Sequence, residues 1–138
     1  MKKIIITCVF LSCLCAGFKI PFYSAYVDKA RGSEARIYIN TIYKQAVIYY
    51  TEVGNVPASL YEMKEQGLLS LDAKAELEWN FDLSQLQEPS GEEARWGLEG
   101  QITATSTEEM AGGEGEIVVY NVETGEWCGY GHKQCWDE

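Results

Sequence analysis

The sequence lacks most of the groups from which enzyme and metal sites are built. His132 is the only histidine among 138 residues, so no site with several histidine ligands can form. No glycine-rich phosphate loop follows a strand pattern, and neither Ser24 nor Ser33 has a histidine that sequence spacing brings near. These absences predict a protein without a catalytic centre, and we expect no cofactor.

Positive charge is also scarce. The chain has 11 lysines and arginines against 21 aspartates and glutamates, a net charge of −10. Nucleic acid is therefore excluded as a partner, because binding phosphate needs a basic surface. The acidic clusters at 92–93, 108–109 and 114–116 lack the Asp-x-Asp pattern of a calcium loop. A solvated surface is the better interpretation, and calcium binding is the alternative.

Residues 1–18 form a segment of their own. Lys2 and Lys3 precede an apolar run of 15 residues, Ile4 to Phe18, which is the layout of a secretory signal. A membrane-spanning helix needs about 20 such residues. We therefore expect export, with three fates open for the segment: cleavage before Phe18, retention as a membrane helix that continues past Lys19, or lipidation at Cys13.

The five cysteines fall into two groups. Three lie in the apolar run, and signal cleavage would leave only Cys128 and Cys135, an even pair as in exported proteins with one disulfide. A metal site is the alternative, but the two thiolates and His132 supply only three ligands. We expect a disulfide that fastens the C-terminal tail to the last strand, constraining the unfolded chain by about 2–3 kcal/mol.

The longest regular pattern lies between Ile20 and Gly54. Apolar residues recur there at steps of three and four, the period of a helix with one buried face; they are Ala35, Tyr38, Ile39, Ile42, Ala46, Tyr49, Tyr50 and Val53. Pro21 is the only proline of the stretch and Gly32 its only internal glycine. The pattern predicts one helix over residues 19–54, about 45 Å long. A helix of this length needs a cover along its stripe.

Residues 55–76 are expected to connect this helix to the rest of the chain. Gly54 and Pro57 end the first helix, and Ser59 and Glu62 have the spacing of a capping box. A short helix is therefore predicted from Leu60 to Gln66.

His132, inside the short loop between the last two cysteines, is interpreted as a solvent-exposed loop histidine.

The remaining residues, 77–138, change to the period of strands. Alternation from Glu76 to Leu83 predicts a strand with a buried face made of Leu77, Trp79, Phe81 and Leu83. A turn is expected at 85–93, a second strand at 94–106 and a mobile loop at 108–115. A third strand follows at 116–122, and a hairpin turn at 121–127 leads into a fourth strand. The predicted fold class is α+β, a long amphipathic helix packed on a three- to four-stranded antiparallel sheet.

One family matches this order of features. Ile20 to Tyr26 resembles the "IPxYxxY" junction, Lys29 to Ala35 the "KAxxSEA" segment, and Ile42 to Leu60 the "IxxAQxxYYxxxGxYPxSL" segment of type IV pilins and type II secretion pseudopilins. The chain departs from them at its start, where their leader motif has no counterpart and their N-terminal glutamate aligns with an isoleucine. Beyond Leu60 the resemblance is architectural and includes a C-terminal disulfide loop, matched by Cys128 and Cys135.

The resemblance implies a structural role. It implies a non-enzymatic subunit of a bacterial surface filament or secretion apparatus, exported and seated in the inner membrane or on the cell surface, with other pilin-like subunits as partners. Helix junction and assembly residues would be Pro21, Tyr23 and Tyr26. The alternative is an exported soluble or lipidated binding module with the same fold, gripping a partner through the loops 108–115 and 128–135.

Overall fold

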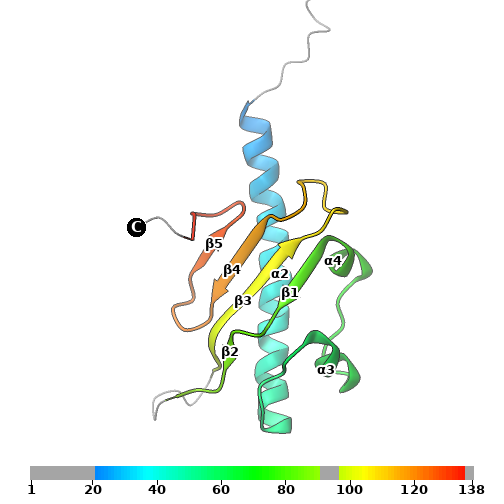
Figure 1. Ribbon diagram of the computed structural model, residues 1–138, viewed down its shortest axis with the longest axis vertical. Coiled ribbons are helices and arrows are strands. Elements are labelled where there is room, and N and C mark those ends of the chain that lie inside the picture. Colours follow the sequence, from blue (N-terminus) through cyan, green and yellow to red (C-terminus); the bar gives the residue numbers. More distant parts are fainter. Residues whose placement is uncertain (1–20, 91–96, 136–138) are drawn as a thin grey trace, which may run out of the picture.

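The computed structural model describes residues 21–90 and 97–135. Its first element is the helix α2 (Pro21–Val53), 33 residues long, which runs behind the sheet in Figure 1 and projects beyond it at the N-terminal end. Gly54 ends the helix with φ 89°, and its N–H donates to the Tyr50 carbonyl at 2.9 Å. The long helix is therefore confirmed over the described residues, while the predicted signal or membrane segment, 1–18, lies outside them.

Two short helices follow, α3 (Leu60–Glu65) and α4 (Ala73–Glu78). The first was predicted, but its capping box does not form. Ser59 stands at the N-cap position without a side-chain bond, and the Glu62 carboxylate accepts instead from the Ala58 N–H at 3.0 Å. The glutamate therefore secures the chain one residue earlier than the motif places it.

The helix α4 corrects the predicted first strand. Asp72 caps it by accepting from the Ala75 N–H at 2.6 Å, and the residues after it are mostly strong helix formers. The first strand therefore begins only at Trp79, and Leu77, predicted to face the core, is 60 % exposed. The alternation around Leu77 predicts the wrong period because the cap at Asp72 starts a helix that continues to Glu78.

The sheet has five strands, all antiparallel to their neighbours. The order is β1-β3-β4-β5, and β2 extends the β1 edge by pairing with the start of β3. The strands are β1 (Trp79–Asp82), β2 (Leu86–Gln87), β3 (Glu99–Ser106), β4 (Ile117–Asn121) and β5 (Trp127–Gly129). Three or four were predicted, because β2 has only two residues and lies inside the stretch assigned to a turn.

Gly100 explains how β2 reaches β3. It has φ 95°, and a Cβ placed on it would lie 1.9 Å from the Gln85 carbonyl oxygen. Only glycine allows the two backbones to approach so closely while keeping this positive φ. The pairing of Leu86 with Gly100 therefore depends on the missing side chain.

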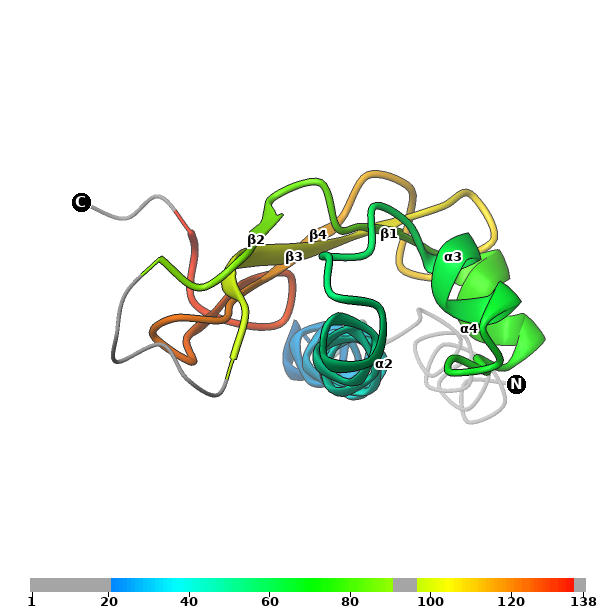
Figure 2. The ribbon, with the colours of Figure 1, turned by 90° about the horizontal axis from the view of Figure 1, so that it is seen from below.

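The core lies between α2 and one face of the sheet (Figure 2). The helix contributes residues at the predicted spacing, Ala35, Ile39, Ile42, Ala46 and Tyr49, and the sheet contributes Trp79, Ile102, Ala104 and Val118. The predicted stripe is confirmed except for Val53, which is 44 % exposed. Val53 is the last residue of the helix, next to the glycine where the chain turns away.

The segment between β3 and β4, predicted as a mobile loop, is folded. Ser106, itself buried, donates through Oγ to the Gly113 carbonyl at 2.6 Å and accepts from the Glu116 N–H at 2.8 Å. The Gly115 N–H donates to the Ser106 carbonyl at 3.0 Å, and Met110 inserts into the core. This "β3–β4 loop" (residues 107–116) therefore has a defined shape.

Truncating two leucines tests the corrected boundary between α4 and β1. Leu83→Ala should lower the free energy of unfolding by about 2–5 kcal/mol, because Leu83 is buried in the core. Leu77→Ala should change it by less than about 0.5 kcal/mol, since Leu77 faces solvent. Urea unfolding of both variants measures the difference. Equal losses would mean that the strand starts before Trp79 after all.

Candidate functional site

The C-terminal loop (residues 128–135) lies directly on the N-terminal half of α2. Gly131, at φ 72°, packs against the turn from Asp28 to Gly32, and a Cβ placed on it would lie 3.2 Å from the Gly32 Cα. A Cβ on Gly32 would lie 2.3 Å from the Tyr130 carbonyl oxygen. The two glycines therefore allow a backbone-to-backbone contact that no larger residue fits.

Tyr130 extends this contact along the helix. Its hydroxyl donates to the Asp28 carboxylate at 2.7 Å, across 102 residues of sequence. Burial, and then this hydrogen bond, raise the pKa of the Tyr130 phenol above its usual value. The phenol therefore keeps its proton, and the bond to Asp28, throughout the neutral pH range.

Aromatic rings join the last strands to the same helix. The Arg36 guanidinium carbon lies 4.8 Å from the centre of the Trp127 ring, a cation–π contact between α2 and β5. Trp127 stacks on Tyr120 of β4 at 4.3 Å, and Tyr120 meets Tyr43 of α2 edge-on at 5.8 Å. The loop and both C-terminal strands are thus attached to α2.

The predicted disulfide is present. Cys128, on β5, is bonded to Cys135 at 2.12 Å, with 4.8 Å between the Cα atoms. The bridge closes the loop that carries Tyr130 and Gly131. It fastens residue 135 to the edge strand, as the sequence predicted.

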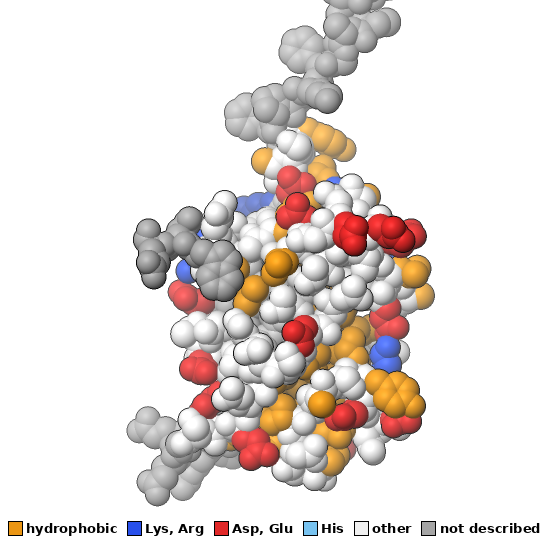
Figure 3. All heavy atoms as spheres, in the orientation of Figure 1, with side chains coloured by type: hydrophobic (Ala, Val, Ile, Leu, Met, Phe, Trp, Pro, Cys, Tyr) orange, Lys and Arg blue, Asp and Glu red, His pale blue; other side chains and the backbone are white. Residues whose placement is uncertain are grey.

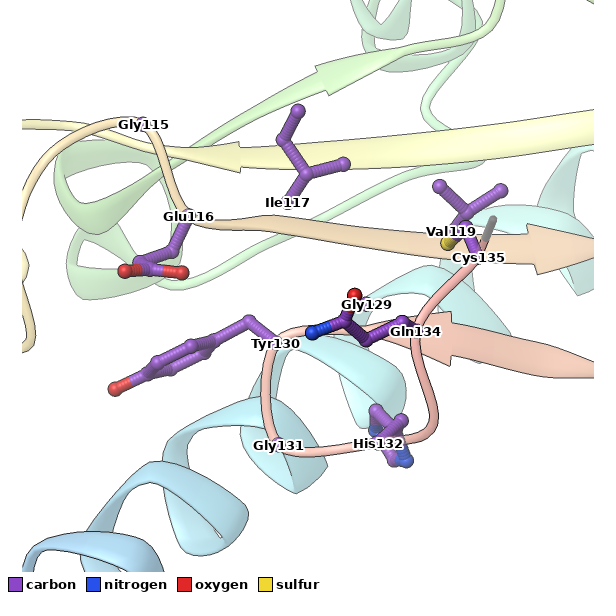
Figure 4. Close-up of a pocket in the computed structure, with 10 residues that line it drawn as sticks. All are labelled: Gly115, Glu116, Ile117, Val119, Gly129, Tyr130, Gly131, His132, Gln134 and Cys135. Carbon is purple, nitrogen blue, oxygen red and sulfur yellow. The ribbon is translucent and has the colours of Figure 1, made fainter. Parts of the chain in front are cut away.

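The outer side of this loop leaves two grooves against β4. One, of about 440 Å³, lies between Ile117, Val119, Tyr130 and Gln134 (Figure 4), and the other, of about 460 Å³, lies beside Thr103, Val119 and Lys133. Both are lined by more apolar than polar surface. His132, predicted to be solvent-exposed, is instead partly buried at the first groove; its Nε2 is shielded from solvent and has no hydrogen-bond partner among the described residues.

A second apolar stripe runs along α2 on the side away from the sheet. Tyr23, Tyr26, Ile37 and Ile48 lie on one side of the helix, this "outer face", at intervals of 3, 11 and 11 residues, and are 70 %, 75 %, 64 % and 40 % exposed. Figure 2 shows no described element on that side of the helix. The helix therefore carries exposed apolar side chains opposite the face that the sheet covers, with the exposed polar residues Ser33 and Lys44 between them. The sequence pattern predicted only the covered face.

The predicted assembly residues stand at the start of α2. Pro21 is its first described residue, and Tyr23 and Tyr26 belong to the outer face, on the end that projects beyond the sheet (Figure 1). The structure brings neither tyrosine together with the disulfide pair of Cys128 and Cys135, which lies against the sheet side. Their role in assembly stays a prediction.

The described residues contain neither a cluster of metal ligands nor a membrane-spanning helix. Within 21–90 and 97–135, no group of three or more histidine, cysteine or acidic side chains is arranged to hold a metal ion. The acidic pairs 108–109 and 114–116 lie at the surface of the β3–β4 loop, and the pair 92–93 lies outside the described residues. No helix in the described ranges is both long and apolar enough to cross a membrane.

Comparison with known proteins gives no relative. No protein-family model matches the chain, and no curated protein or solved structure matches it either. The function is therefore argued from the geometry of the chain and from its sequence motifs.

The contacts between α2 and the C-terminal loop were missed by sequence reasoning. Gly32 gave the only usable signal, because a lone glycine inside a long helix pattern often marks a close backbone approach. Asp28 and Arg36 gave none, since each meets a partner more than 90 residues away and looks like an ordinary surface charge.

A methyl group at Gly32 tests the backbone contact. Alanine is favoured over glycine in a helix by about 1 kcal/mol, whereas overpacking costs about 1–3 kcal/mol. Because the new Cβ would meet a backbone carbonyl at 2.3 Å, we expect Gly32→Ala to lower the free energy of unfolding in urea by about 1–2 kcal/mol.

Ser33→Ala is the matched control, since it places alanine at the next, exposed position of the same helix. It should leave stability unchanged or raise it by about 0.5 kcal/mol. If Gly32→Ala stabilises the protein as an open helix position would, the close contact with Tyr130 is wrong.

Proposed function

We propose that the chain is a non-enzymatic structural subunit of the type IV pilin or type II secretion pseudopilin kind. In this proposal it is exported and forms part of a bacterial surface filament or secretion apparatus. The outer face of α2 would pack against other pilin-like subunits. The motifs from Ile20 to Leu60 support this assignment, together with the long helix that carries a sheet on one side only.

The outer face of α2 is the observation that carries the proposal. A helix that lies on the surface of a soluble domain normally turns charged and polar residues to solvent. Here tyrosines and isoleucines recur on that face over more than six turns, from Tyr23 to Ile48. Exposed apolar side chains aligned along one side of a helix support a contact with another protein, although polar residues such as Ser33 and Lys44 lie between them.

The N-terminal end of α2 would connect the subunit to the membrane. Tyr23 and Tyr26 are the most exposed residues of the outer face and stand where the helix projects beyond the sheet. The apolar run of residues 4–18 precedes them in the sequence. We propose that this run is retained and seats the subunit in the inner membrane, while the sheet and the disulfide loop face outward.

The grooves beside the disulfide loop favour the second candidate, an exported soluble or lipidated binding module. Their volumes, about 440 and 460 Å³, suit a small ligand or a single inserted side chain. A module of this kind would use the loop region and would leave the outer face of α2 in water. The two candidates therefore differ in what touches α2.

Crosslinking in cells distinguishes them. We would place a photo-crosslinking residue at Tyr26 or Ile37 in the full chain, irradiate the producing cells and identify the product by mass spectrometry. A subunit packed through α2 should give adducts with pilin-like chains, including other copies of itself. Both positions are well exposed within one chain, so an adduct there reports a neighbour.

Asn80 is the matched control, because it is also exposed but lies on β1, away from α2. It should give at least about fivefold less adduct than Ile37 if the neighbours meet mainly through the helix. Adducts from Asn80 but none from Tyr26 or Ile37 would overturn the proposal. A chain found only as a monomer, beginning at or after Phe18, would instead favour the binding module.

A further inference from the structure

We infer that the outer face of α2 receives the β3–β4 loop of a second copy of the chain, with Lys44 paired to carboxylates of that loop. The inference rests on the proposed function, since it presumes that copies pack through α2. It adds which part of the neighbour lies on the helix, and with what shift along the helix axis.

Charge is divided unevenly between α2 and the rest of the described chain. The helix carries four basic and three acidic residues, a net charge of +1. The described residues after it carry three basic and 14 acidic residues, a net charge of −11. Two copies that met sheet to sheet would repel each other, whereas a helix against an acidic surface is complementary.

Lys44 lies within the apolar outer face. It stands between Ile37 and Ile48 at helical spacing, and its side chain has no hydrogen bond or ion pair with any described residue. Of the other described cations, Arg36 contacts the Trp127 ring, and the Lys29 side chain also has no hydrogen bond or ion pair but lies to one side of the stripe. If the stripe is covered by a neighbour, Lys44 loses water and needs a carboxylate, because an unpaired buried charge is strongly destabilising.

The β3–β4 loop supplies such carboxylates. Most acidic side chains in the described ranges already bind an internal N–H, hydroxyl or ammonium group. The exceptions are Glu52, Glu88, Glu108, Glu109, Glu114 and Glu116, and four of these six belong to the loop. Figure 3 shows acidic side chains gathered where the loop lies in Figure 1.

The loop presents these charges from a fixed backbone. The hydrogen bonds of Ser106 and the buried Met110 hold it in shape, so little conformational entropy is lost when it binds. Its tip also contains Ala111, Gly112 and Gly113, small residues that allow a close approach to a helix. The loop therefore combines unpaired carboxylates with an ordered backbone and a tip of small residues.

The position of the loop in its own chain sets the shift between copies. A Cβ placed on Gly112 would touch the Tyr130 hydroxyl, and this hydroxyl donates a hydrogen bond to Asp28. The β3–β4 loop therefore lies at the same height along α2 as Asp28. From Asp28 to Lys44 is 16 residues, about 24 Å along the axis. Each copy would therefore be displaced by about 24 Å relative to the next. A contact between different surfaces, repeated with such a shift, leads to an open chain of subunits.

A photo-crosslinking residue at Ile48, one turn from Lys44, tests this contact in cells that produce the full chain. The adduct should join Ile48 to residues 107–116 of a second copy. Lys44→Glu should lower its yield about fivefold or more, because it sets like charges against each other. Adding Glu108→Lys and Glu109→Lys to the same chain should restore the yield to within about twofold.

Lys29→Glu is the matched control, with the same charge change on the same helix but off the stripe, and it should alter the yield by less than about twofold. Adducts at another segment of the second copy, or equal losses from both lysine variants, would overturn the inference and leave the proposed function standing. Absence of any adduct with a second copy from Ile48 would likewise overturn the inference, and absence of any adduct with a pilin-like chain, from Ile48 and from Ile37 alike, would overturn both.

Discussion

The backbone contact between Gly32 and Gly131 determines how the parts of this protein are arranged. It brings the disulfide loop onto α2, and with it the edge strand β5, whose Trp127 lies under Arg36. The sheet is thereby held against the helix at its C-terminal edge, while the core of isoleucines and Trp79 holds its centre. With both attachments on one side, the opposite side of α2 is left without a cover from the described chain.

That uncovered side gives the molecule its functional character. A single domain of this size would gain solubility from polar residues along the outer face of α2, yet it carries Tyr23, Tyr26, Ile37 and Ile48 there. The described residues after α2 are strongly acidic, so they would repel the same surface of another copy, whereas α2 would not. Apolar burial would supply the affinity between copies, and charge would select which surfaces pair.

Much of this fold could be predicted from the sequence, because it follows from local patterns. The sequence predicted the long helix and most of its buried stripe. It also predicted the β4–β5 hairpin and the pairing of Cys128 with Cys135. One error came from two competing local signals, because the alternation around Leu77 outweighed the helix cap at Asp72. Another came from length, because β2 is too short to show a strand pattern. The contacts of Asp28, Gly32 and Arg36 depend on tertiary pairing across most of the chain, which periodicity and motif spacing do not encode. The outer face gives a weak sequence signal because its apolar residues lie up to 11 positions apart with polar residues between them.

The central claim is that the second face of α2 is buried between copies in the cell. Hydroxyl-radical labelling of envelopes from producing cells, compared with the dissociated protein, tests it most directly. Tyr26 and Tyr61 are 75 % and 65 % exposed within one chain, but only Tyr26 lies on the outer face. The account predicts that labelling of Tyr26 falls at least about fivefold in the assembled state, while labelling of Tyr61 stays within about twofold. Equal labelling of Tyr26 in both states would contradict it.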